Sequence, residues 1–156
     1  MRKVMVWGLV LLALAGAATA ATWKSFTAPD KRFSIDFPGD PTQMKEQQGI
    51  QGWAIFADMK AYTVTISTES GIKDLDAGAQ DKALLEFAAN FFQGAEVTTT
   101  NQKSISGGYE FTGTITEDKD RVNAQVLKDA PNDRVYILMT FGEAESQRFF
   151  DSFKKL

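Results

Sequence analysis

The sequence contains no cysteine and no histidine, and these two absences set the first limits on its chemistry. Without cysteine the chain can form no disulfide bond, so its hydrophobic core must hold the fold alone. The two absences together exclude the Ser-His and Cys-His nucleophile systems and the usual zinc ligands. The chain also lacks a run of like charges long enough to predict a disordered tail or a polybasic membrane patch.

The first twenty residues have the order of a secretory signal. A basic pair at residues 2–3 precedes an apolar run over residues 4–16, and Ala18-x-Ala20 then forms a small-residue cleavage site. The run is shorter than the roughly 20 residues that a membrane-spanning helix needs, and no cysteine is present for lipid attachment. We therefore predict a periplasmic or secreted protein, residues 21–156, with no stable membrane anchor after cleavage.

Size and charge narrow the class of the mature protein. Removal of the signal leaves 136 residues, which is the size of one domain, with 15 basic and 20 acidic residues. A net charge of −5 argues against nucleic-acid binding, which requires a clustered basic surface. Twelve phenylalanines and 44% hydrophobic residues can supply the core.

The N-terminal half predicts strands. In "FSIDFPG" three apolar residues alternate with polar ones, and Pro38-Gly39 then ends the strand in a tight turn. Asp36 and Asp40 are expected to be solvated. The same criteria predict strands over residues 23–26, 33–37, 53–57 and 61–68, with Tyr62, Val64 and Ile66 on one face and a polar connection over 43–48.

The apolar period changes to that of a helix over residues 76–93. Its predicted buried stripe consists of Leu84, Phe87, Ala88 and Phe91. Asp76 is placed to cap its start and Gly94 to end it.

Strands return after this helix. "KSISGGYEFTGTIT" predicts two short strands about Gly107-Gly108, and further strands are predicted over 121–128 and 134–141. The segment 134–141 is apolar on both faces, which is typical of a central strand covered on both sides. A C-terminal helix is predicted over 143–153. Short turns require antiparallel neighbours, so the fold class is α+β.

Two segments carry a resemblance to a known family. "FTAPDKRFSIDFPGDP" resembles the opening of small exported PsbP-like bacterial proteins, and "RFFDSFKKL" is similar to their C-terminal end. The resemblance implies an α–β–α sandwich around an antiparallel sheet, with a long helix after the N-terminal strands and a C-terminal helix. That fold is shared with an extrinsic photosystem II subunit, a Ran-binding protein and the lipoprotein DcrB. It implies binding or assembly work and carries over no functional residue.

Carboxylates are the remaining candidates for chemistry. Asp74 and Asp76 precede the long helix, and Asp118 and Asp120 lie with Glu117 in a turn. Oxygen ligands suit hard cations, so Asp118 and Asp120 are candidate ligands for a weak cation site, although neither group has EF-hand spacing and a solvated turn is the simpler interpretation. No catalytic residue, cofactor or specific metal is predicted.

Two functions remain open. The first is a noncatalytic exported module that binds a protein or another component of the cell envelope. The second is a small hydrolase or lyase that uses carboxylates alone, as some glycosidases do.

For the first function the candidate partner-binding residues are Ile50, Trp53 and Phe149. Ile50 and Trp53 lie in the glycine-flanked "GIQGW", where a large aromatic can be partly exposed, unless Trp53 closes the edge of the sheet. Adjacent residues on a helix point about 100° apart, so Phe149 is expected at the boundary of a face that Phe150 shares with Phe153.

Overall fold

The computed structural model describes residues 22–57, 59–142 and 144–156. The predicted signal over residues 1–20 lies outside these ranges. The described chain has the predicted α+β architecture, with an antiparallel sheet, a long helix after the N-terminal strands and a short C-terminal helix. No helix within these ranges is long and apolar enough to cross a membrane.

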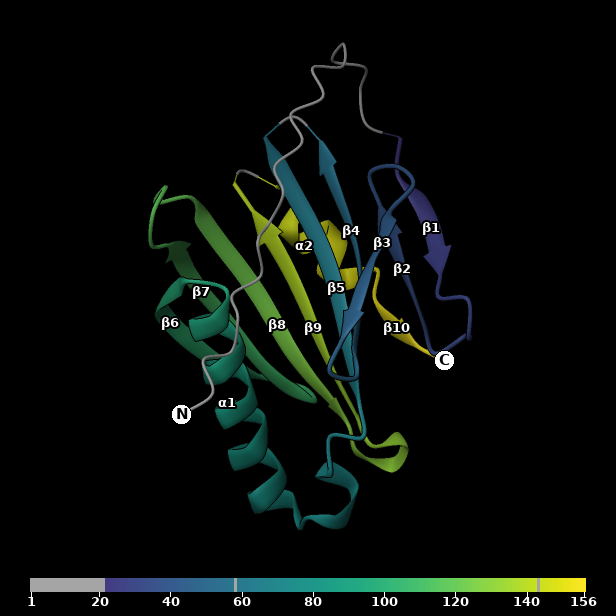
Figure 1. Cartoon of the computed structure of the whole chain (residues 1–156), viewed down its shortest axis with the longest axis vertical. Coiled ribbons are helices and arrows are strands. Elements are labelled where there is room, and N and C mark those ends of the chain that lie inside the picture. Colours follow the sequence, from purple (N-terminus) through teal and green to yellow (C-terminus); the bar gives the residue numbers. More distant parts are fainter. Residues whose placement is uncertain (1–21, 58, 143) are drawn as a thin grey trace.

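A large antiparallel sheet forms the middle layer (Figure 1). Within the described residues its seven strands have the order β3-β4-β5-β9-β8-β7-β6. Their bounds are Thr42–Gln47 for β3, Ile50–Ala57 for β4, Lys60–Thr68 for β5, Val97–Ile105 for β6, Gly108–Ile115 for β7, Arg121–Asp129 for β8 and Arg134–Phe141 for β9. The strand predicted to be covered on both faces, β9, is the fourth of the seven, so that prediction is confirmed.

Two different layers cover the two sides of this sheet. One side is covered by the long helix α1 (Ala77–Gly94), which the 3-10 turn η1 (Ile72–Asp74) precedes. The other is covered by the short helix α2 (Ser146–Asp151) and by a second, three-stranded sheet. That small sheet has the order β1-β2-β10, with β1 at Lys24–Thr27, β2 at Phe33–Phe37 and β10 at Lys154–Lys155.

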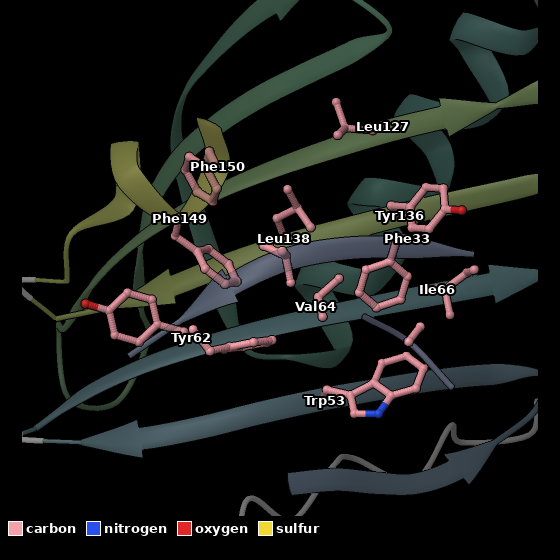
Figure 2. Close-up of a cluster of buried hydrophobic side chains, with 13 residues drawn as sticks. Phe33, Trp53, Tyr62, Val64, Ile66, Leu127, Tyr136, Leu138, Phe149 and Phe150 are labelled. Atoms are coloured by element: carbon pink, nitrogen blue, oxygen red, sulfur yellow. The ribbon is translucent and has the colours of Figure 1, made fainter. Parts of the chain in front are cut away.

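The opening motif "FSIDFPG" belongs to the core between the two sheets. Phe33, Ile35 and Phe37 are all fully buried. Figure 2 shows Phe33 among side chains of the large sheet, and its ring centroid lies 5.3 Å from that of Trp53 and 5.9 Å from that of Tyr136. The alternating apolar residues of this motif therefore have a structural role in the core, as predicted.

The core beneath α1 contains only two of the four predicted stripe residues as buried positions, together with one residue that was not predicted. Leu84, Ala88 and Phe92 are the buried positions, whereas Phe87 and Phe91 are half-buried. Packing on the sheet uses the row of every fourth residue, so Phe92 replaces the predicted Phe91. The cap is confirmed, because the Ala79 N–H donates to the Asp76 carboxylate at 2.9 Å.

Several element boundaries differ from the predictions. β4 begins at Ile50 rather than at residue 53, and β6 begins at Val97, well before the short strand predicted ahead of Gly107. The polar segment 43–48 is largely the edge strand β3, because a strand with solvent on both faces lacks apolar alternation. The C-terminal helix is only six residues long. Gly94 is the last residue of α1 rather than its terminator, and Glu96 takes the left-handed conformation that was expected of the glycine.

Candidate binding surfaces

The exposure predicted for two partner-binding candidates is wrong. Trp53 is 3% exposed and Phe149 is fully buried, both in the core between the two sheets. The centroid of the Phe149 ring lies 5.3 Å from that of Phe37 and 5.4 Å from that of Tyr62. Figure 2 shows Phe149 and Tyr62 side by side. Since α2 contacts both β2 and β9, apolar neighbours surround more than one side of this short helix. Adjacent phenylalanines are therefore both buried in α2.

Ile50 and Trp53 also lie on opposite faces of β4. Successive side chains of a strand alternate between faces, so residues three apart cannot share one. The register pairs Trp53 with Val64, whose side chain points toward the small sheet, and pairs Ile50 with Ser67. Ile50 is half-buried on the side of the sheet that α1 occupies. A role of Ile50 in partner binding stays a prediction.

The predicted acidic groups lie far apart. Asp74 and Asp76 stand at the start of α1, next to the end of the sheet where β8 finishes. Asp118 and Asp120 are exposed in the turn before β8 begins. The nine residues of β8 separate the two ends by roughly 26 Å, at about 3.3 Å per residue. A carboxylate of one group therefore cannot act together with a carboxylate of the other on a single substrate.

Asp118 and Asp120 do not gather further ligands within the described part of the chain. No group of three or more Asp or Glu side chains in those ranges is arranged to hold a metal ion. Among the described residues, no third carboxylate therefore joins Asp118 and Asp120 in a metal-binding arrangement.

The half of the large sheet not covered by α1 forms a surface that we call the open face. The apolar cluster beneath α1 takes its strand residues from β6 to β9 and none from β3 to β5. Figure 1 shows α1 over β6 to β8, at a distance from β3 and β4. By register, the open face consists of Thr42, Met44, Gln47, Ile50, Gly52, Ala54, Phe56, Ala61, Thr63, Thr65 and Ser67.

None of the residues of the open face is charged. Phe56 is 54% exposed, and Met59, in the turn that joins β4 to β5, is 99% exposed. The floor of the surface is built from small side chains, and Met44 lies directly over Gly52, where a Cβ would overlap it. The open face is therefore shallow, uncharged and bordered by exposed apolar side chains.

The opposite side of the sheet provides an internal comparison. There most of β6 and β7 lies outside the core between the two sheets, and their outward side chains are polar except for Ile105, which packs against that core. Lys103 faces Glu110 across the two strands, and Gln125 of β8 donates to the Glu110 carboxylate at 3.0 Å. This surface has the composition expected of a solvated strand face, with polar side chains outward. The open face does not have that composition.

A cleft of about 700 Å³ separates α1 from the edge strand β6. The helix contributes Leu85, Ala89, Phe92 and Gln93, and the strand segments contribute Val97, Thr98, Thr99, Gln102, Phe111 and Thr116. Glu96 also lines the cleft and is the only charged residue among these described lining residues.

The shifted pKa values belong to structural contacts away from the cleft and the open face. The Arg32 side chain holds the pKa of Asp30 below its usual range through a hydrogen bond. Desolvation raises the pKa of Asp133, but hydrogen bonds from the backbone N–H groups of Lys73 and Gly71 outweigh it, so the pKa lies below its usual value. Burial raises the pKa of Tyr136, whose hydroxyl donates to the Arg32 carbonyl. These contacts hold neighbouring segments of the chain together.

Two solved structures share this arrangement of layers. Cyanobacterial PsbP (CyanoP) from Synechocystis sp. PCC 6803 is similar over 93% of this chain and 99% of its own, with a TM-score of 0.57 and 12% identity. The fold is PsbP-like. The Saccharomyces cerevisiae Ran-binding protein Mog1p is similar over 86% of this chain and 96% of its own, with a TM-score of 0.55 and 9% identity.

These likenesses concern the fold alone, since both identities are low. No protein-family model matches the sequence, and no curated protein matches it significantly. The resemblance in "FTAPDKRFSIDFPGDP" and "RFFDSFKKL" is thereby confirmed for the fold, and both segments contribute mainly to the core and to the turns that the fold requires.

Phe56 is the exposed aromatic that sequence reasoning missed. The strand "IQGWAIFA" holds large apolar residues at odd and even positions, so alternation does not say which set faces the core. The pairing of β4 with β5 could have identified the exposed set. It places the small residues Gly52, Ala54, Ala61 and Thr63 on one face of the sheet, which predicts little side-chain packing on that face.

Proposed function

We propose that this protein is a noncatalytic binding or assembly module that contacts a protein partner through the open face. The observation that carries the proposal is the absence of charge from a sheet surface that exposes Phe56 and Met59. Exposed apolar surface without charges costs solubility, so its retention indicates a partner that covers it. Ile50 belongs to the same face and is the one predicted partner-binding residue that the proposal keeps.

The fold comparisons support binding in general terms. One similar structure is described as a Ran-binding protein and the other as a cyanobacterial PsbP. A fold of this kind is compatible with many functions, so the argument for this chain rests on its own surface.

The partner is proposed to be met outside the cytoplasm, in the periplasm or the secreted medium. The support is the basic, apolar and small-residue order of residues 1–20. Intact-mass measurement on protein recovered from a secreting host is expected to give a chain that starts at Ala21. Retention of residues 1–20 at the membrane would contradict this part of the proposal.

The binding proposal is tested with one variant and a matched control. Phe56→Asp places a charge at the border of the open face, near the turn between β4 and β5, whereas Leu75→Asp changes another exposed apolar residue, 38% exposed and located before α1. Both variants are used as bait on an envelope extract of the producing organism, and their melting temperatures are measured in parallel.

We expect a discrete partner to be recovered with wild type and Leu75→Asp and lost with Phe56→Asp, at unchanged melting temperatures. Equal recovery of the same partner by both variants would show that the open face is not the contact surface. The recovered partner is identified by mass spectrometry and its affinity for the purified protein is then measured.

A further inference from the structure

The edge strand β6 has less protection against pairing than the other edge of the sheet. Edge strands are commonly protected by charges, prolines, bulges or short length. β3 has six residues, follows Pro41 and carries Lys45 and Glu46. β6 has nine residues with Lys103 as its single charge and no proline, and one bulge at Thr100 interrupts its register. The outer backbone groups of β6 are therefore available to a further strand.

The cleft beside β6 lies where side chains of such a strand would enter. Residues of β6 that point toward α1 include Val97, Thr99 and Gln102, and all three line the cleft. A strand paired with β6 would send every second side chain to this same side. Those side chains would meet the α1 residues Leu85 and Ala89, which form the helical wall.

Glu96 gives the cleft a negative charge that does not help to stabilise the fold. It follows the C-terminus of α1 with a φ of 57°, a conformation that favours glycine. A carboxylate there also opposes the helix dipole, since cations are the favoured charges at a helix C-terminus. As the sole charged residue among the described lining residues, Glu96 would attract a basic group of a ligand.

We propose that β6 and the cleft bind an extended peptide segment of a partner protein by strand addition. The segment carries apolar side chains at alternate positions, which enter between α1 and β6, and a Lys or Arg that meets Glu96. The bulge at Thr100 limits the number of consecutive backbone hydrogen bonds that an added strand can form with β6. Selectivity among peptide sequences therefore comes mainly from the side chains that enter the cleft.

A second copy of this chain is a poorer occupant of the same edge. Paired β6 strands would direct the polar Thr99, Gln102 and Ser104 of one copy toward the α1 residues Leu85 and Ala89 of the other, which apolar side chains complement better. The single basic residue of β6, Lys103, lies on the opposite face and would not reach Glu96. This site is independent of the open face, and its test uses different variants and a different ligand.

The probe is a random decapeptide library displayed on phage and selected on the purified protein. We expect enriched peptides with apolar residues at alternate positions and Lys or Arg near one end. Synthetic versions are then measured by fluorescence anisotropy. Failure to enrich any peptide, or enrichment without alternation, would overturn the proposal.

Two neighbouring helix positions provide the variant and its control. Ala89 and Asn90 are both exposed on α1, but only Ala89 lines the cleft. Ala89→Arg is expected to raise the Kd of a selected peptide at least tenfold, and Asn90→Arg to leave it within twofold. Equal Kd values for the two variants would exclude the cleft.

Charge and pairing are tested separately. Glu96→Lys is expected to weaken Lys-containing peptides at least tenfold and to favour their Glu counterparts. Peptide binding is also expected to slow amide exchange within β6 and to leave exchange in β3 unchanged. Binding that protects β3 or the open face instead, or a concentration-dependent dimer whose contacts protect β6 without peptide, would refute strand addition by a partner segment.

Discussion

Truncation of Phe33 is the most direct test of the core between the two sheets. Its side chain is fully buried, and four aromatic rings surround it, those of Phe26, Trp53, Tyr136 and Phe153 at centroid distances of 5.3 to 6.2 Å. Buried Phe→Ala changes cost about 3–5 kcal/mol, and aromatic pairs add about 0.5–1.5 kcal/mol each beyond their area. We therefore expect Phe33→Ala to lose about 4–5 kcal/mol.

That loss is a large part of the about 5–15 kcal/mol that stabilises a typical domain. It is measured by urea denaturation, where the midpoint should fall at unchanged slope. The control is Phe56→Ala, the same change at a residue that is 54% exposed, which should cost less than about 1 kcal/mol. A cost for Phe33→Ala below about 2 kcal/mol, or equal costs for the two variants, would refute the packing described here.

Four further substitutions test the local architecture. Asp36→Asn and Asp40→Asn should each change the free energy of unfolding by less than about 0.5–1 kcal/mol. Asp36 donates to Ser152 through its backbone N–H, which the substitution keeps, and Asp40 forms an exposed ion pair with Lys24. Loss of partner binding at unchanged stability would instead give these aspartates a function. Asp76→Ala should cost about 1 kcal/mol in thermal melts through loss of the α1 cap, and an unchanged melt would contradict that role. Gly108→Ala should prevent expression of soluble protein, since its Cβ would overlap the carbonyl oxygen of Val126 on β8, and a normal yield would contradict the close approach of the two strands.

The sequence predicts the centre of the sheet better than its margins. β9 could be assigned as central because Val135, Ile137 and Met139 pack beneath α1 while Tyr136 and Leu138 pack toward the small sheet. A strand buried on both faces has an unmistakable composition. The polar edge strand β3 has no such composition, because neither of its faces is fully covered.

The binding surfaces were harder to predict for a related reason. Trp53 was a reasonable candidate by residue type, but its exposure depends on the small sheet, whose residues Phe26 and Phe33 pack against it. Contacts between segments so distant in sequence leave no local pattern. The cleft at β6 likewise depends on where α1 crosses the sheet, and the helical period does not encode that placement.

The offset of the two covering layers links the fold to both proposed sites. On one side of the large sheet α1 lies over β6 to β8 and does not cover β3 to β5. On the other side the small sheet packs toward β4 and β5 and does not cover most of β6 and β7. Glu110 and Lys103 make one of these halves polar, as solvent exposure requires. The other half carries no charge; burial accounts for this at Ala54, Ala61 and Thr65 but not at Phe56, which is exposed. The same offset places α1 at the free edge of β6, where a helix and an unpaired strand together can receive a peptide backbone and its side chains.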